Sequence, residues 1–240
     1  GDGDVDARDY GFFVGNDENM WTWRVPVGGT IYAPPHRVWD NEGRPGGTQI
    51  RKAMGTLIVE GIRPYVFVAA WDGCLWTRYW DWSEAHWENL GRPGAAEVAG
   101  PMGTWLADGN RPLIFMKASD GNLWLCQSAY NSWTWDNLGM PAGNVSPDFT
   151  VGITMDGDLL YLFFRGSDGD IWCRWWSGGA WEWTHHGRPE PDQYITGGGG
   201  ARFQRGGGTE WLDVGVHTTN GSWKLRWRGD WKRWFWERAG

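Results

Sequence analysis

A short motif recurs along this chain at a constant spacing, and the spacing restricts the possible folds more than any other feature. Gly-x-Pro occurs at Gly43, Gly91, Gly139 and Gly187, each 48 residues after the one before. A tryptophan lies four residues ahead of each glycine, and Gly240 has one at the same distance. These tryptophans are Trp39, Trp87, Trp135, Trp183 and Trp236. Five copies of one unit indicate a repeat architecture.

A second motif recurs in step with the first. WDGCLW ends at Trp76, SDGNLW at Trp124 and SDGDIW at Trp172, and NDENMW is an eroded copy that ends at Trp21. TNGSWK, at 219–224, keeps the Asn-Gly pair, and this alignment puts Lys224 in the place of the closing tryptophan. Asp-Gly or Asn-Gly between two apolar runs is typical of a β-hairpin, because a type I′ turn needs positive φ at both central residues.

The rest of the unit consists of strand-like segments. The third copy contains GTWLAD, RPLIFMKAS, NLWLCQS and SWTWDNLG, which are rich in β-branched and aromatic residues and are separated by turn residues. We therefore predict an all-β fold: a five-bladed β-propeller of four-stranded antiparallel blades, about 48 residues per repeat, forming a single domain over residues 1–240. The predicted blades are 1–45, 46–93, 94–141, 142–189 and 190–240.

Charge suggests how the predicted ring closes and argues against some partners. Four aspartates near the start (Asp2, Asp4, Asp6, Asp9) are expected to attract the basic residues of the fifth copy (Lys224, Arg226, Arg228, Lys232, Arg233). Such surface pairs contribute roughly 0–1 kcal/mol each. The net charge of −7 argues against nucleic acid, although the segment WKLRWRGDWKRW mixes tryptophan with basic residues as a stacking surface would. No apolar run is long enough for membrane insertion.

Cysteine and histidine spacing predicts no metal centre. Cys74, Cys126 and Cys173 are odd in number and widely spaced, so we expect small buried strand residues rather than disulfides or metal ligands. His185 and His186 are adjacent, and neighbouring residues of a strand point to opposite faces, which argues against joint ligation. No cofactor is implied.

The repeated unit resembles that of the Trp-rich propeller lectins of the bacterial PLL type and, more loosely, the Aleuria-type fucose lectins. The shared pattern is DG-x-LW-x-x-x-W followed by W-x-W-x-x-x-G-x-P, and it covers nearly the whole chain. PLL-type lectins have more blades than the five copies here. The resemblance implies sugar sites in clefts between blades, with fucose-like or methylated sugars as candidates. The Arg and Glu pair of the Aleuria-type site has no match at corresponding positions.

The predicted third strands carry the candidate ligand-binding residues. Residues of one face alternate along a strand, and these faces present tryptophan beside arginine. An indole stacks on the apolar face of a sugar, and a guanidinium donates to its oxygens. The candidates are Trp76, Arg78, Trp80, Trp124, Trp172, Arg174, Trp176, Arg226 and Trp21. Packing between blades is the competing role for each tryptophan, and a salt bridge is the competing role for each arginine.

These observations predict a lectin that binds glycans or glycoconjugates and carries no catalytic residues. A propeller-fold hydrolase or cyclase with a single site in the central channel is one alternative, because a fold can bring together carboxylates that lie far apart in sequence. A protein-interaction propeller is another, since Trp-Asp pairs occur at Trp39-Asp40 and Trp135-Asp136. A secreted or extracellular location is favoured, and an oligomer is compatible with the sequence.

Overall fold

The fold is all-β in a computed structural model, which describes residues 10–24, 38–61, 63–81, 83–129, 132–206, 208–229 and 232–239. The strands are β1 (Tyr10–Val14), β2 (Met20–Arg24), β3 (Val38–Gly43), β4 (Ile50–Val59), β5 (Arg63–Ala70), β6 (Leu75–Trp80), β7 (Ala85–Gly91), β8 (Val98–Ala107), β9 (Arg111–Ala118), β10 (Leu123–Ala129), β11 (Ser132–Gly139), β12 (Pro147–Asp156), β13 (Leu159–Gly166), β14 (Ile171–Trp176), β15 (Trp181–Gly187), β16 (Ile195–Gly206), β17 (Thr209–Thr218), β18 (Gly221–Arg228) and β19 (Arg233–Arg238).

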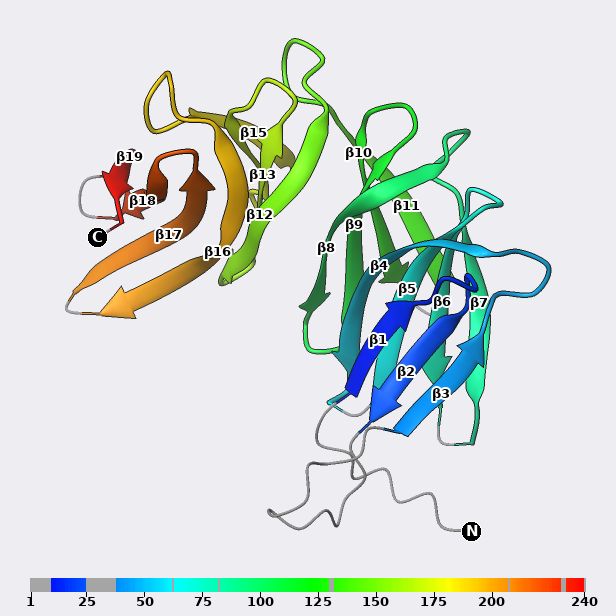
Figure 1. Cartoon of the computed structure of the whole chain (residues 1–240). Coiled ribbons are helices and arrows are strands. Elements are labelled where there is room, and N and C mark those ends of the chain that lie inside the picture. The colour runs from blue at the N-terminus through cyan, green and yellow to red at the C-terminus, as the bar shows by residue number, and fades with distance from the viewer. Residues whose placement is uncertain are drawn as a thin grey trace, which may run out of the picture.

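The strands form five antiparallel sheets in chain order: β1–β3, β4–β7, β8–β11, β12–β15 and β16–β19, here called the first to fifth sheets. Within each sheet, neighbours in space are neighbours in sequence, so every connection is a hairpin. Figure 1 shows the sheets following one another around a common interior, with the first and fifth at the two ends of the series. The predicted all-β organisation in repeated four-stranded units is confirmed for the second to fifth sheets.

The repeated Asp-Gly motif is a turn that ties an aspartate to a tryptophan. In the second sheet the Asp72 carboxylate accepts from the Cys74 backbone N–H at 2.9 Å and from the Trp76 indole N–H at 3.0 Å. Trp124 donates in the same way to Asp120, and Trp172 to Asp168. The glycine of the turn, Gly73, has φ of 79°, which a residue with a Cβ adopts only with strain. The motif therefore recurs because each copy builds the same hairpin.

Apolar clusters between successive sheets make up the core. Phe67 and Leu75 of the second sheet pack against Ile114 and Cys126 of the third, and all four are fully buried. Similar clusters fill the other three junctions between neighbouring sheets. The second, third and fourth sheets therefore bury their two faces against different neighbours, as expected for repeated sheets that cannot bury both faces alone.

The innermost strands β4, β8, β12 and β16 approach so closely that glycine is required. A Cβ on Gly103 would lie 2.6 Å from Cδ1 of Ile153, and one on Gly152 would lie 2.3 Å from the backbone nitrogen of Ala201. Real atoms do not approach that closely, so a side chain there would push the neighbouring strand away. Each glycine therefore sets the distance between two sheets.

The first sheet differs from the prediction because its described part has three strands rather than four. The bond from Trp21 to Asp17 marks the hairpin between β1 and β2 as the counterpart of the β5–β6 hairpin, so β1 corresponds to a second strand. No described strand occupies the innermost position of this sheet. Asp2, Asp4, Asp6 and Asp9, which were expected to close the ring against the fifth sheet, lie outside the described residues.

Candidate functional site

The same residue position recurs at all four junctions between described sheets. It lies in the middle of the third strand of the later sheet, where it pairs with the repeated tryptophan of that sheet's fourth strand. It holds Arg78 in β6, Cys126 in β10, Arg174 in β14 and Leu225 in β18. The opposed tryptophans are Trp87, Trp135, Trp183 and Trp236. The side chain at this position faces the preceding sheet, so these four residues determine the chemistry of the four junctions.

The tryptophans opposite these residues join neighbouring sheets. The Trp135 indole N–H donates to the Leu90 carbonyl of the preceding sheet at 2.7 Å, and Trp236 donates to the His186 carbonyl at 3.1 Å. Trp87 makes a longer bond of 3.4 Å to the Glu42 carbonyl. The tryptophans repeat because they bridge and pack the junctions, which supports the structural role weighed for them from sequence.

Arg174 is the most unusual of the four residues. Its guanidinium carbon lies 4.5 Å from the centre of the Trp183 ring, and its buried Nε has no hydrogen-bond partner. Within the described residues it forms no ion pair, and burial lowers the pKa of its guanidinium. Because a buried donor without an acceptor destabilises the folded protein, this arrangement needs a reason other than stability. A guanidinium in this state can donate hydrogen bonds to an acceptor that reaches it.

Aromatic rings surround Arg174 on its own sheet. Trp172 is 8% exposed and packs in the apolar cluster, whereas Trp176 is partly exposed and meets Trp181 edge to face, with ring centres 5.6 Å apart. A partly exposed indole next to an unpaired guanidinium offers a stacking surface and directed donors together.

Arg78 occupies the equivalent position at the first junction but has an acidic partner. Its Nη2 lies 3.3 Å from Oε2 of Glu42, which belongs to β3 of the first sheet, and its Nη1 donates to the Ala85 carbonyl at 3.1 Å. Trp80 and Trp87 flank the guanidinium at 5.8 and 5.4 Å. Guanidinium, carboxylate and two indoles thus meet between sheets, although the buried Nε of Arg78 has no partner.

Glu42 was not among the residues predicted from the sequence, because it lies in a different repeat from Arg78. Glu42 comes from the preceding sheet, where its counterparts at the next junctions are Leu90, Leu138 and His186. Glu42 could have been found by aligning the repeats, because it is a charged residue at a position that is leucine in two of the other copies.

The fifth sheet contradicts one sequence-based alignment. Its β17–β18 hairpin pairs Thr218 with Gly221 across two residues, whereas the fourth sheet encloses one residue more between Gly166 and Asp170. The missing residue moves the following strand by one place, and this exchanges its faces. Trp223, rather than Lys224, therefore corresponds to Trp172, and Leu225 corresponds to Arg174.

Arg226 consequently points away from the junction. Its guanidinium pairs with Asp213 of β17 at 2.6 Å and with Glu237 of β19 at 2.9 Å. The hydrogen bonds that Arg226 donates to the Asp213 carboxylate raise the pKa of its guanidinium. The structure thus separates Arg226 from the predicted set and gives it carboxylate partners.

The remaining candidates occupy four places. Trp76, Arg78 and Trp80 face the junction between the first and second sheets, and Trp124 faces that between the second and third. Trp172, Arg174 and Trp176 face the junction between the third and fourth. Trp21 lines a hollow of about 460 Å³ on the first sheet, beside Phe13, Asp17 and Trp39. The predicted site residues thus lie at separate places along the series of sheets, and the prediction placed them in several clefts.

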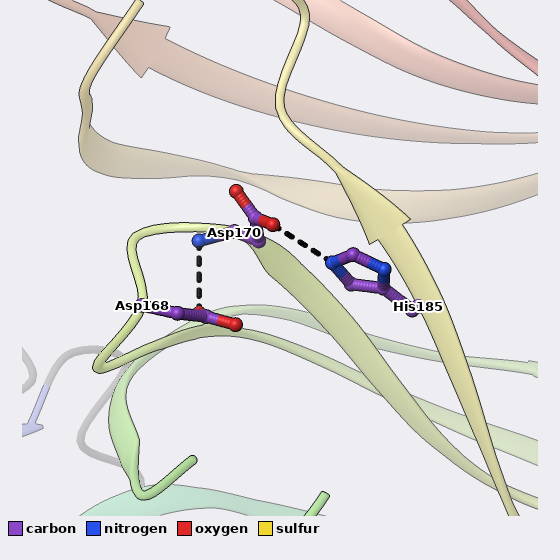
Figure 2. A group of neighbouring side chains, drawn as sticks. All are labelled: Asp168, Asp170 and His185. Atoms are coloured by element: carbon purple, nitrogen blue, oxygen red, sulfur yellow. Dashed lines mark hydrogen bonds and ion pairs between the residues drawn. The ribbon is translucent and has the colours of Figure 1, made fainter. Parts of the chain in front are cut away.

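One group of side chains has the composition of a metal site, but its atoms are already engaged. Asp168, Asp170 and His185 place ligand atoms within 4.8 Å of one another (Figure 2). His185 Nε2 lies 2.8 Å from one oxygen of Asp170, and Arg188 donates to the other at 2.6 Å. Trp172 donates to Asp168 at 3.0 Å. A guanidinium beside the carboxylate argues against a cation, so the group serves as a brace for the hairpin.

The other polar predictions have mixed outcomes. His185 meets Asp170, whereas His186 packs against Trp234 of the fifth sheet with ring centres 4.5 Å apart, so the two histidines have different surroundings. All three cysteines are free; Cys126 and Cys173 are buried in strands, but Cys74 is partly exposed in a turn. Burial raises the pKa of both buried thiols. The prediction for Cys74 is therefore wrong.

Several solved structures share the fold, and two of the three described here are lectins. A triple arginine-to-alanine variant of AofleA from Arthrobotrys oligospora matches with a TM-score of 0.59 and 11% identity, over 95% of this chain and 67% of that one. A variant of Aleuria aurantia lectin in complex with alpha-methyl-L-fucoside gives 0.56 and 12%, over 95% and 72%. A third structure, titled as a fungal lectin with a six-bladed β-propeller fold and a novel fucose recognition mode, gives 0.51 and 13%, over 95% and 72%.

The likeness is thus to Aleuria-type propeller lectins, and at these identities it concerns the fold. No family model matches the chain, and no curated protein matches it. Among the described residues, the structure has no helix with the length and apolar character that a membrane span requires.

Proposed function

We propose that this protein is a carbohydrate-binding lectin whose sugar sites lie between neighbouring sheets. The observation that carries the proposal is Arg174: a half-buried guanidinium that stacks on Trp183 and has no acceptor among the described residues. A neutral sugar supplies what this site lacks, because its hydroxyl and ring oxygens accept hydrogen bonds without bringing a second charge into a poorly hydrated place.

The ring beside Arg174 supports a sugar over other neutral ligands. Trp176 is partly exposed and held at an angle by Trp181, so it offers a flat surface on the same face of β14 as the guanidinium. Pyranoses present apolar C–H groups on one face and hydroxyls at the edge, which matches an indole next to a guanidinium. Fucose-like or methylated sugars are the proposed ligands, since both carry an additional apolar methyl group.

Arg78 forms the second proposed site. There Glu42 adds an acceptor to the donors of the guanidinium, and Trp80 and Trp87 provide the apolar surface. The remaining junctions have Cys126 and Leu225 in place of the arginine, so we assign no site to them. The proposal therefore expects two sites per chain, each weak alone and strengthened by multivalent glycans. It includes no catalytic step.

Calorimetry with alpha-methyl-L-fucoside, after a glycan array has identified the preferred sugar, tests the proposal. We expect two sites per chain, and we expect Arg174→Ala to reduce the number to one with little change in melting temperature. Arg202→Ala, which removes an exposed arginine from β16, is the matched control. The proposal fails if the protein binds no glycan on the array. It also fails if the Arg174→Ala variant binds sugar normally but has a much lower melting temperature, because Arg174 would then have a structural role.

A further inference from the structure

A polar residue directly follows the repeated tryptophan in the outermost strand of each of the second to fifth sheets. Because neighbouring residues of a strand point to opposite faces, this residue lies on the face opposite to its tryptophan. Most of these residues are acidic, so each needs a hydrogen-bonding partner or full access to water. They are Glu88 in β7, Asp136 in β11, Thr184 in β15 and Glu237 in β19.

The neighbouring third strand supplies a partner in three of these four sheets. Gln127 donates to the Asp136 carboxylate at 2.7 Å, and the Trp175 indole N–H donates to the Thr184 hydroxyl at 3.1 Å. Arg226 makes the corresponding ion pair in the fifth sheet at 2.9 Å. The donor always comes from the residue that follows the position opposite the repeated tryptophan. The sheets therefore satisfy this polar group in the same way each time.

The second sheet departs from this pattern at Glu88. Tyr79 takes the place of the donor, but its ring stacks on Tyr65 of β5, with ring centres 5.2 Å apart and planes 13° apart. Glu88 is partly buried, and within the described residues it makes no hydrogen bond or ion pair. Burial raises the pKa of the Tyr79 hydroxyl, and the negative charge of Glu88 raises it further. Glu88 thus lies beside two aromatic rings without the partner that its counterparts have.

Two basic residues flank the tyrosine stack, and each has an acid of its own. His86 Nε2 lies 2.7 Å from Oδ2 of Asp81, and Arg63 Nη2 lies 2.9 Å from Oε2 of Glu60. These pairs leave the Glu88 charge unbalanced among its described neighbours. A carboxylate that has lost part of its hydration attracts a cation that can reach it.

Aromatic rings lie near Glu88 on both sides of the junction between the second and third sheets. Thr77 pairs with Glu88 across β6 and β7, so Tyr79 is the diagonal neighbour of Glu88 on the same face. Such neighbours lie about 7–8 Å apart, and a cation that interacts with a ring lies within about 6 Å of its centre. Trp133 of the third sheet meets Phe67 of this face edge to face, at 6.1 Å. The spacing suits one ammonium group between a carboxylate and a ring.

We propose that the second-to-third junction binds the protonated amino group of an amino sugar between Glu88, Tyr79 and Trp133. The Glu88 carboxylate accepts hydrogen bonds from the ammonium group, and the Tyr79 ring attracts its charge. The carbon skeleton of the sugar lies against Trp133, whereas an inorganic cation would leave the indole without a partner. This third site takes a cation and uses no arginine, so it does not depend on whether Arg78 or Arg174 binds a neutral sugar.

The fourth sheet supplies a matched comparison, because it has the same aromatic stack without the acid. Tyr161 and Trp175 stack with ring centres 5.8 Å apart, and Thr184 stands in the place of Glu88. The bond from Trp175 satisfies this threonine. Glu88→Thr therefore copies an arrangement that the fold already contains, and it removes the charge on which the proposal depends.

A titration of the full-length protein with glucosamine, followed by nuclear magnetic resonance, tests the site. At about pH 6 the amine is protonated. We expect saturable shifts at the amides of Tyr79 and Glu88 and at the indole N–H of Trp133, with weaker binding at higher salt. N-acetylglucosamine has the same ring without the charge and should leave these signals unchanged. Signals from Arg78 and Arg174 report on neutral sugars separately, so failure of one kind of site is distinguishable from failure of the other.

Protein variants identify the residue responsible. Glu88→Gln keeps the shape and removes the charge, and we expect it and Glu88→Thr to weaken glucosamine binding at least about tenfold. Glu84→Gln, which changes an exposed glutamate just before β7, is the control and should bind as the unchanged protein does. Circular dichroism verifies that all three variants fold. The proposal is overturned if glucosamine does not shift these signals saturably, if N-acetylglucosamine binds there with the same affinity, if both Glu88 variants keep their affinity, or if Glu84→Gln loses as much.

Discussion

The junction between the third and fourth sheets and the junction between the fourth and fifth are built on the same framework but differ at the position opposite the repeated tryptophan. Arg174 stands opposite Trp183 in the former, and Leu225 stands opposite Trp236 in the latter. Leu225 is 1% exposed and belongs to the apolar cluster of its junction, whereas the Nε of Arg174 has no partner.

The difference separates packing from binding. Tryptophans frame both positions, so a tryptophan in this repeat does not by itself mark a ligand site. Leu225 brings no polar atom of its own to the junction, whereas Arg174 brings a buried Nε that has no partner. Buried His186 Nε2 and Trp223 Nε1 also lack partners at the fourth-to-fifth junction, so the comparison concerns this one position and not the whole junction. We infer that the arginine at the third-to-fourth junction serves binding.

The largest expected effect follows from moving the arginine into the packed junction. Leu225→Arg places a charge beside Trp236 in a cluster without an acidic partner, and we expect the free energy of unfolding to fall by about 3 kcal/mol or more. Urea denaturation measures this change. Leu225→Ile, which conserves volume, is the control and should lose less than about 1.5 kcal/mol. If the arginine variant is as stable as the control, the two junctions are equally tolerant and the comparison fails.

The reverse exchange should affect binding instead of stability. Arg174→Leu reproduces the packed junction, and we expect the free energy of unfolding to stay the same or rise, because an unsatisfied donor is removed. Sugar affinity at this site should fall at least about tenfold, which corresponds to about 1.4 kcal/mol. Calorimetry and urea denaturation on the same preparation separate the two quantities. A loss of stability without a loss of affinity would show that Arg174 is a structural residue.

The next prediction concerns how the stability of the protein depends on pH, through His186 at the fourth-to-fifth junction. Burial, with a smaller contribution from His185, lowers the pKa of His186 from 6.5 to about 4. Because the folded protein binds this proton more weakly than the unfolded chain does, stability is complete above pH 6.5 and declines as the pH falls toward 4. We expect a loss of about 1–2 kcal/mol by pH 5.

Urea denaturation at a series of pH values measures this loss. His186→Gln should flatten the profile in this range, and His217→Gln, which changes an exposed histidine, should leave it unchanged. An unchanged profile in the first variant would mean that His186 is accessible to solvent in the folded state.

The sequence predicted the repeated unit well because local rules determine it. The spacing of glycine and tryptophan and the Asp-Gly turns identify hairpins without knowledge of the rest of the chain. The sequence did not predict which face Arg226 occupies, because a single residue lost from the preceding hairpin reverses the alternation in β18. It did not predict the pairing of Arg78 with Glu42, because those residues meet only when two sheets pack. Local periodicity determines the sheets, and contacts between sheets determine the site.

The smallest effect tests the register that separates Arg226 from Arg174. Arg226→Ala removes ion pairs to Asp213 and Glu237 on a partly exposed face, so we expect a loss of no more than about 1 kcal/mol, reduced further by salt. Sugar affinity and the number of sites should not change, because the side chain points away from the junction. Urea denaturation at low and high salt and calorimetry measure these quantities. Weaker sugar binding in this variant would mean that β18 is shifted by one residue. Arg226 would then occupy the position assigned to Leu225. The fourth-to-fifth junction would in that case be a binding site like the third-to-fourth junction.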